Sequence, residues 1–321
     1  MHTTESRVEA AVPLPAAGGP RPVPRADVRL LPSRWQEQYA AAADYYVHRL
    51  PTDDVLHGFR RAAGLAAPGQ GLTGWCREDS RVVFGQWLSG LARFAGSGNR
   101  EAADKAWRLM DGWAETFRRE PAMLVQHYRF DKLVGGLVDI AEHVESSDSL
   151  RLLSRLVDVG RQQLSRRNRP AVPWPAGPSD GDELEWYTLG ENLLRAFALT
   201  GDERYRALIR RYRRPRIFEA ILRGEDPLTM MHANTTIPEA LGYARAYEVL
   251  GEAEDLKVVQ AYWDLAVEKR GYFPTGGQTW REVWTPPLQQ AAFLGDSNQE
   301  HCVVYNMIRL ADFLFRHTGR M

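Results

Sequence analysis

The sequence predicts an all-α protein built as a helical array or a closed ring of helical hairpins. Turn signals recur about fifty residues apart, near residues 98, 148, 201 and 251. Each is a small or turn-forming residue followed by an acidic or polar first turn, which suits the positive end of a helix dipole. Between them, apolar residues recur at three- and four-residue steps, and no stretch alternates long enough to predict a sheet. This period fits one pair of antiparallel helices per unit.

The first thirty residues are predicted to precede this helical region as a disordered, proline-rich lead-in. They contain few aromatic residues and five closely spaced prolines, Pro13, Pro15, Pro20, Pro22 and Pro24. Such a composition does not bury a core. No basic flank precedes an apolar stretch there, so we do not expect a secretory signal. Residues 31–321 are predicted to form a single domain.

Individual helices are predicted from the apolar spacing and from start signals. Residues 35–50 and 81–95 place their aromatic and aliphatic side chains on one helical face. Pro238 is expected in the first turn of a helix that ends near Leu250. A further helix over 303–316 is followed by a fifth turn signal, "RHTGRM". We therefore expect the last hairpin to lack its second helix, which leaves the barrel incomplete at the C-terminus.

Composition excludes several classes of partner. Lys+Arg and Asp+Glu number 41 each, and this balance argues against nucleic acid, which needs an excess of positive charge. No apolar run is long enough to cross a bilayer. Two cysteines in so long a chain fit a reducing compartment, so we expect a cytoplasmic protein. A small-molecule or carbohydrate substrate is expected, and homo-oligomerisation is left open.

Polar residues before Pro238 form the first candidate site. His232 and Asn234 lie at the predicted mouth of a helix, where they could bind hydroxyl groups. The alternative is an ordinary loop histidine. Glu191, inside an otherwise apolar helical stretch, is either a ligand-binding group or half of a salt bridge.

Glu282 is the second candidate, because Trp280 and Trp284 flank it in a Gly/Pro-rich loop. A carboxyl crowded by indoles has a raised pKa and can act as a general acid, since desolvation disfavours the anion. The alternative is an ion pair with an arginine. Aromatic faces such as those of Trp75, Trp280 and Trp284 suit sugar rings, although core packing explains most tryptophans.

Glu300 and Cys302 form the third candidate, in the stretch "NQEHCVVYNM". Two residues apart on a non-helical lead-in, they could share one zinc ion as carboxylate and thiolate. The alternative is a buried structural cysteine.

Taken together, these segments resemble glycoside hydrolase family 127 and its relatives, the β-L-arabinofuranosidase-like hydrolases. "HANTTIP" and the pattern E-x-C-x-x-Y-N-M are the most specific pieces, and the resemblance covers residues 30–321. It implies an (α/α)6 barrel. It also implies that Glu282 is the general acid/base, His232 a sugar-binding residue, and Glu300 and Cys302 two of the zinc ligands. In the family, a later Cys-Cys pair supplies another zinc ligand and the nucleophile.

Departures from the family pattern open three hypotheses. Gln86 and Asp131 stand where the family has histidines, Cys76 stands where it usually has glutamate, and no Cys-Cys pair is present. The first hypothesis is a glycosidase-like enzyme with an altered or lost zinc–thiolate nucleophile. The second is a repurposed barrel, a lyase, cyclase or dehydratase that acts on a small hydroxylated natural product through Glu282, Asp131 or His232. The third is a non-catalytic binding relative.

Overall fold

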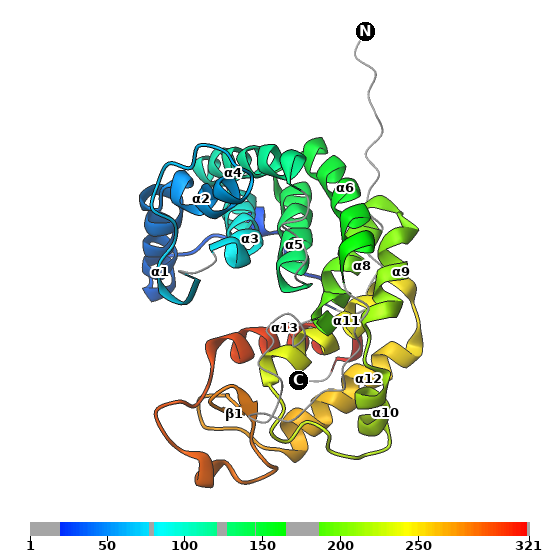
Figure 1. Ribbon diagram of the computed structural model, residues 1–321. Helices are drawn as coiled ribbons and strands as arrows, with labels where there is room; N and C mark the ends of the chain where they lie inside the picture. Colours follow the sequence, from blue (N-terminus) through cyan, green and yellow to red (C-terminus); the bar gives the residue numbers. More distant parts are fainter. Residues whose placement is uncertain (1–19, 77–79, 121–126, 145, 165–185, 320–321) are drawn as a thin grey trace.

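The computed structural model describes residues 20–76, 80–120, 127–144, 146–164 and 186–319. The described chain is mostly helical, and its helices follow one another around an arc (Figure 1). Successive members of an inner layer pack against each other, and contacts between their side chains connect them in chain order. The inner helices are α1 (Arg34–Ala43), α3 (Phe84–Gly96), α5 (His127–His143), α8 (Gly190–Thr200), α11 (Ala233–Leu250) and α13 (His301–Thr318).

An outer layer returns the chain between inner helices. Its members are α2 (Thr52–Ala62), α4 (Arg100–Arg119), α6 (Ser147–Gln163), α9 (Glu203–Tyr212) and α12 (Ala253–Trp263), and α10 (Pro215–Leu222) packs on α12. Helices α1 and α12 continue into π-helical turns, Asp44–Arg49 and Asp264–Lys269. Short 3-10 turns lie at Arg25–Asp27, Gly74–Cys76, Ser80–Val83, Trp186–Leu189 and Gln290–Phe293. This alternation confirms the predicted all-α, (α/α)6-type barrel of hairpins.

The recurring turn signals precede helices, as predicted, and the helices that follow them belong to the outer layer. Asn99 accepts a hydrogen bond from the Ala102 amide at 3.0 Å and so caps α4. Ser146 caps α6 and Asp202 caps α9 in the same way. Capping satisfies backbone N–H groups that have no partner within the helix. Local sequence therefore determined where these hairpins turn.

Two glycines allow α3 and α5 to cross closely. A Cβ atom on Gly85 would lie only 1.9 Å from the backbone oxygen of Lys132, and one on Gly136 would lie 2.6 Å from the Gly85 oxygen. Buried apolar side chains form two clusters, one mainly over α1–α9 and one over α10–α13. The second cluster supports the loop that carries Glu282.

Three features differ from the sequence-based expectation or qualify it. Helix α11 begins at Ala233, so Pro238 lies inside the helix and not in its first turn. A minimal antiparallel hairpin, β1 (Thr279–Trp280) and β2 (Val283–Trp284), interrupts the helical pattern. Of the predicted disordered lead-in, residues 20–30 contain one 3-10 turn and no other regular secondary structure, and residues 1–19 lie outside the described residues. No helix of the described ranges combines the length and apolar character needed to cross a membrane.

Candidate active site

The β1–β2 hairpin is bonded through its backbone to the start of α11. The Ala233 amide donates to the Glu282 carbonyl at 2.8 Å, and the Trp284 amide donates to the Met231 carbonyl at 3.0 Å. The Glu282 backbone therefore caps a free N–H group at the start of α11, which explains why this helix begins before Pro238. His232 and Glu282 are consequently neighbours despite their separation in the sequence.

The same hairpin is bonded on its other edge to the segment that leads into α13. The Arg281 amide donates to the Ser297 carbonyl at 2.7 Å, and the Gln299 amide donates to the Thr279 carbonyl at 3.3 Å. Glu300 is the N-cap residue of α13. Backbone bonds on both edges thus bring three segments of the chain to one place.

A series of buried hydrogen bonds joins the β1–β2 hairpin to α11 and α12. Trp284 is 0 % exposed, and its Nε1–H donates to the Thr236 hydroxyl at 2.9 Å. That hydroxyl also pairs with the Tyr262 hydroxyl at 2.9 Å. Sequence reasoning placed Trp284 against a substrate. The structure places it in the core, because its indole packs between α11 and α12 and supports the turn that carries Glu282.

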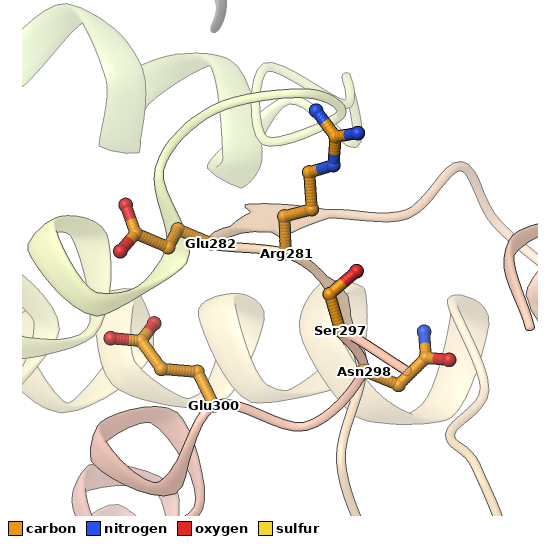
Figure 2. Close-up of a pocket in the computed structure, with 5 residues that line it drawn as sticks. All are labelled: Arg281, Glu282, Ser297, Asn298 and Glu300. Carbon is orange, nitrogen blue, oxygen red and sulfur yellow. The ribbon is translucent and has the colours of Figure 1, made fainter. Parts of the chain in front are cut away.

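A pocket of about 530 Å³ opens beside the turn (Figure 2). Glu282 and Glu300 extend to the same side of the turn, and the Glu282 Oε2 atom lies 3.2 Å from His232 Nε2. The side chains of His232 and Glu282 are 21 % and 52 % exposed, so both are accessible. Glu282 is therefore half exposed and is not enclosed by the two indoles. The lining residues are Arg281, Glu282, Ser297, Asn298 and Glu300.

Strained backbone conformations surround this pocket. Met230, Arg281 and Gln299 all have positive φ angles, of 65°, 53° and 66°, which non-glycine residues rarely adopt. Each lies one or two residues before His232, Glu282 or Glu300. Strain of this kind clusters at functional sites, where the surrounding structure holds it in place. The sequence near these residues did not indicate the positive φ angles.

The environment of Glu300 and Cys302 keeps both groups protonated more readily than usual. Burial raises the pKa of Glu300, while the Cys302 thiol and His232 act in the opposite direction. Cys302 is exposed overall, yet partial desolvation of its sulfur and the neighbouring Glu300 carboxylate raise the pKa of the thiol to about 11. Such a shift favours the thiol over the thiolate, which is the reactive form.

The described residues do not complete a zinc site here. One Glu300 oxygen is buried without a hydrogen-bond partner, and Cys302 lies beside it, which suits two ligands. A tetrahedral zinc site needs four ligands, or three and a water. No third His, Cys, Asp or Glu donor gathers with this pair within the described ranges. We therefore derive no chemical step through zinc.

Asn234 and Trp280 lie near the pocket residues. The Asn306 amide donates to Asn234 Oδ1 at 2.8 Å, which ties α11 to α13. Trp280 packs edge-on against Phe293 at 5.5 Å and carries the Arg281 guanidinium over its ring at 4.5 Å.

Glu191 forms a salt bridge, which is one of the two roles that the sequence left open for it. Its carboxylate pairs with Arg309 and lies 4.0 Å from Arg245. These guanidinium groups outweigh burial and lower the pKa of Glu191 to about 2. Because both cations come from other helices, no local pattern could have distinguished this role from ligand binding.

Two predicted residues belong to the α3–α5–α8 side of the barrel. Gln86 is exposed and donates to the Tyr128 hydroxyl at 3.1 Å. Asp131 is 2 % exposed, accepts from Asn192 at 2.9 Å and pairs with Lys132 at 2.8 Å. Asp131 is thus buried within an intramolecular network and does not line the pocket beside Glu282. The Trp75 side chain lies outside the described residues.

One acidic cluster resembles a metal site but already holds a cation. Asp139, Glu142 and His143 could place three ligand atoms together. Arg195 donates to Asp139 at 2.5 Å and to Glu142 at 2.6 Å, so a guanidinium occupies this position.

Comparison with known proteins agrees with this arrangement. The family model of the GH127 β-L-arabinofuranosidase catalytic domain matches residues 27–321. The chain belongs to the GH127 family. None of the curated proteins compared with it matches.

Two solved GH127 structures share its fold. One is a GH127 β-L-arabinofuranosidase from Geobacillus stearothermophilus, with a TM-score of 0.57 and 16 % identity over 88 % of this chain. The other is a GH127 β-arabinofuranosidase, with a TM-score of 0.64 and 14 % identity over 97 % of this chain. The alignments cover 49 % and 53 % of those chains, so this GH127 chain spans about half their length.

Proposed function

We propose that this chain is a glycoside-hydrolase-like enzyme acting on a sugar or a sugar-containing small molecule, with Glu282 as its acid/base residue. The observation that carries the proposal is the Glu282–His232 pair, 3.2 Å apart and accessible, beside a pocket of about 530 Å³. Membership of the GH127 family supports a carbohydrate substrate. A pocket of this volume lies within the range of small-molecule sites.

Glu282 and His232 have different roles in the proposed hydrolysis. Glu282 donates a proton to the leaving oxygen as the bond between that oxygen and the sugar carbon breaks. A water molecule adds to the same carbon, and the proton that it releases returns to Glu282. His232 orients the Glu282 carboxyl through the 3.2 Å contact.

A second candidate function is elimination or cyclisation of a small hydroxylated substrate. It is favoured by the accessible Glu282–His232 pair. An acid/base pair alone suffices for such chemistry. Turnover in water enriched in heavy oxygen separates the two, since hydrolysis places solvent oxygen in the product and elimination does not. A third hypothesis, a non-catalytic binding relative, is rejected by any turnover above background.

The test of Glu282 compares alkyl glycosides with nitrophenyl glycosides, including L-arabinofuranosides. Glu282→Gln should lower kcat/KM on alkyl glycosides by about 10²- to 10⁴-fold, the usual range for general acid–base catalysis. The loss should be smaller on nitrophenyl glycosides, because their leaving groups need little protonation. Glu254→Gln, on the exposed face of α12, is the control and should leave both activities unchanged. Unchanged turnover in Glu282→Gln would refute the assignment.

A further inference from the structure

Arg281 is a positively charged residue of the pocket, and the part of the chain that the structure describes gives it no acidic partner. It lines the pocket beside Glu282, and among the described residues no Asp or Glu lies within ion-pair distance of its guanidinium. Its side chain instead stacks on the Trp280 ring at 4.5 Å from the ring centre. Stacking of this kind fixes the plane of a guanidinium and leaves its edge N–H donors available.

The backbone of Arg281 is strained in a way that glycine would relieve. Its φ angle of 53° lies in the left-handed region, at the first position of the two-residue turn between β1 and β2. For a residue with a side chain this conformation is unfavourable, and glycine adopts it freely. An arginine that retains this cost beside a candidate acid points to a use for its side chain.

Arg281 and the two carboxyl groups occupy different sides of the turn. In Figure 2, Glu282 and Glu300 extend to one side and the guanidinium lies toward the other. A group bound by Arg281 would therefore be a substituent that flanks the reacting bond.

The other residues that line the pocket indicate which chemical group Arg281 would bind. The Asn298 side chain is already bonded to backbone groups of Gly295, Thr279 and Phe293, so it contributes shape more than recognition. A planar guanidinium matches a carboxylate through two parallel hydrogen bonds. Glu282 and Glu300 lie close by, and in their ionised form they disfavour a doubly charged phosphate more than a singly charged carboxylate.

We propose that Arg281 binds a carboxylate on the substrate, so that the pocket accepts an acidic sugar of the uronic acid class. This inference rests on the proposed function, since it names the substrate class of the same site. The inference concerns only how the substrate is bound, whereas the proposed function concerns turnover.

The test measures binding of glucuronate and galacturonate against glucose and galactose by calorimetry and by tryptophan fluorescence. The unsubstituted protein should bind the uronates more tightly than the neutral sugars. Arg281→Gln should reduce uronate affinity about ten- to hundred-fold, the usual worth of a charged hydrogen bond, and leave neutral sugars unaffected. Arg206→Gln is the matched control, because Arg206 also stacks on an aromatic ring, Phe197, but pairs with Glu203.

A second variant keeps the test independent of folding. Arg281→Gly should relieve the positive φ angle, so its melting temperature should equal or exceed that of the parent while uronate selectivity is lost. Equal affinity for neutral and acidic sugars, selectivity retained in both variants, or tighter binding of glucose 6-phosphate than of glucuronate would each overturn the proposal. Binding is measured without turnover, so full activity in Glu282→Gln would refute the proposed function and leave this result intact.

Discussion

At the scale of single residues, Thr236 links the core to the candidate site. Its hydroxyl accepts from the Trp284 indole and pairs with the Tyr262 hydroxyl, and all three side chains are completely buried. Each buried donor needs a partner, because an unsatisfied one loses its hydration without compensation. The position of the Glu282 turn therefore depends on a hydroxyl that does not itself line the pocket.

Thr236→Val should lower the free energy of unfolding by about 2–6 kcal/mol, because two buried donors lose their acceptor at about 1–3 kcal/mol each. It should also reduce activity through movement of the Glu282 turn. Urea denaturation measures the first effect. The matched control is Thr116→Val on α4, where the equally buried hydroxyl only donates to the Trp113 carbonyl. A Thr236→Val variant as stable as this control would contradict the argument.

Some of the residues that the sequence singled out lie together in the structure, and others do not. Motifs around His232, Glu282 and Glu300 drew attention to residues that the structure brings together. Glu191 could not be assigned the same way, since its Arg309 partner lies 118 positions along the chain. Trp284 was misplaced because burial depends on which helices the hairpin packs against. Arg281 was not predicted, because nothing in the sequence distinguishes an arginine that adopts a positive φ angle from any other arginine.

At the scale of elements, the crossing of α3 and α5 illustrates how close packing is achieved. The backbone of α5 fills the space that a side chain on Gly85 would occupy. Backbone atoms cannot move as the end of a flexible side chain can, so a methyl group there has to separate the two helices.

Gly85→Ala should therefore destabilise the protein by about 1–3 kcal/mol or more, the usual cost of overpacking. Gly90→Ala provides the internal comparison, since Gly90 lies on the same helix and no atom lies within 4 Å of its added methyl group. That change should be neutral or stabilise by up to about 1 kcal/mol, because alanine has the higher helix propensity. Thermal melts of the two variants should move in opposite directions or differ clearly in size.

Most elements could be predicted because their determinants are local. Turn residues and capping side chains lie within a few positions of the helices that they delimit. The β1–β2 hairpin escaped prediction for the opposite reason. Its strands have two residues each, too few for an alternating pattern, and bonds to Met231 and Ser297 stabilise it. The start of α11 was misjudged because the Glu282 carbonyl caps it.

At the scale of the whole molecule, buried ion pairs connect the inner helices. Asp139 of α5 pairs with Arg93 of α3 at 3.1 Å and with Arg195 of α8 at 2.5 Å. Its side chain is 1 % exposed. Although burial alone would raise the pKa of Asp139, the two guanidinium groups lower it to about 2. Three inner helices thus share one charged centre.

These pairs predict acid sensitivity of the whole barrel. A carboxyl whose folded-state pKa lies below its ordinary value stabilises the fold above that ordinary value and loses the effect as the pH falls through the folded pKa. For Asp139, whose ordinary value is 3.8, the contribution should be complete above pH 3.8 and lost on descent through about pH 2. The amount is about 2 kcal/mol.

Urea denaturation between pH 5 and pH 2 is the measurement, at about half-unit intervals. Asp139→Asn should be less stable at pH 5, since the guanidinium groups of Arg93 and Arg195 lose a carboxylate partner, and its stability should depend less on pH below 4. Asp111→Asn, which changes an exposed carboxyl on α4, is the comparison and should follow the parent curve. Parallel curves for Asp139→Asn and the parent would exclude Asp139 as the source of acid lability.

The main-chain bonds around the β1–β2 hairpin have an evolutionary consequence. Every residue has a backbone carbonyl and every residue except proline has an amide N–H, so these bonds can survive most substitutions at the positions that they join. A lineage can therefore exchange the groups that face the pocket, one at a time, while their relative placement is inherited unchanged. The main-chain arrangement can thus be kept while the side chains in the pocket, and with them the chemistry, change. This suits a lineage that adopts new substrates.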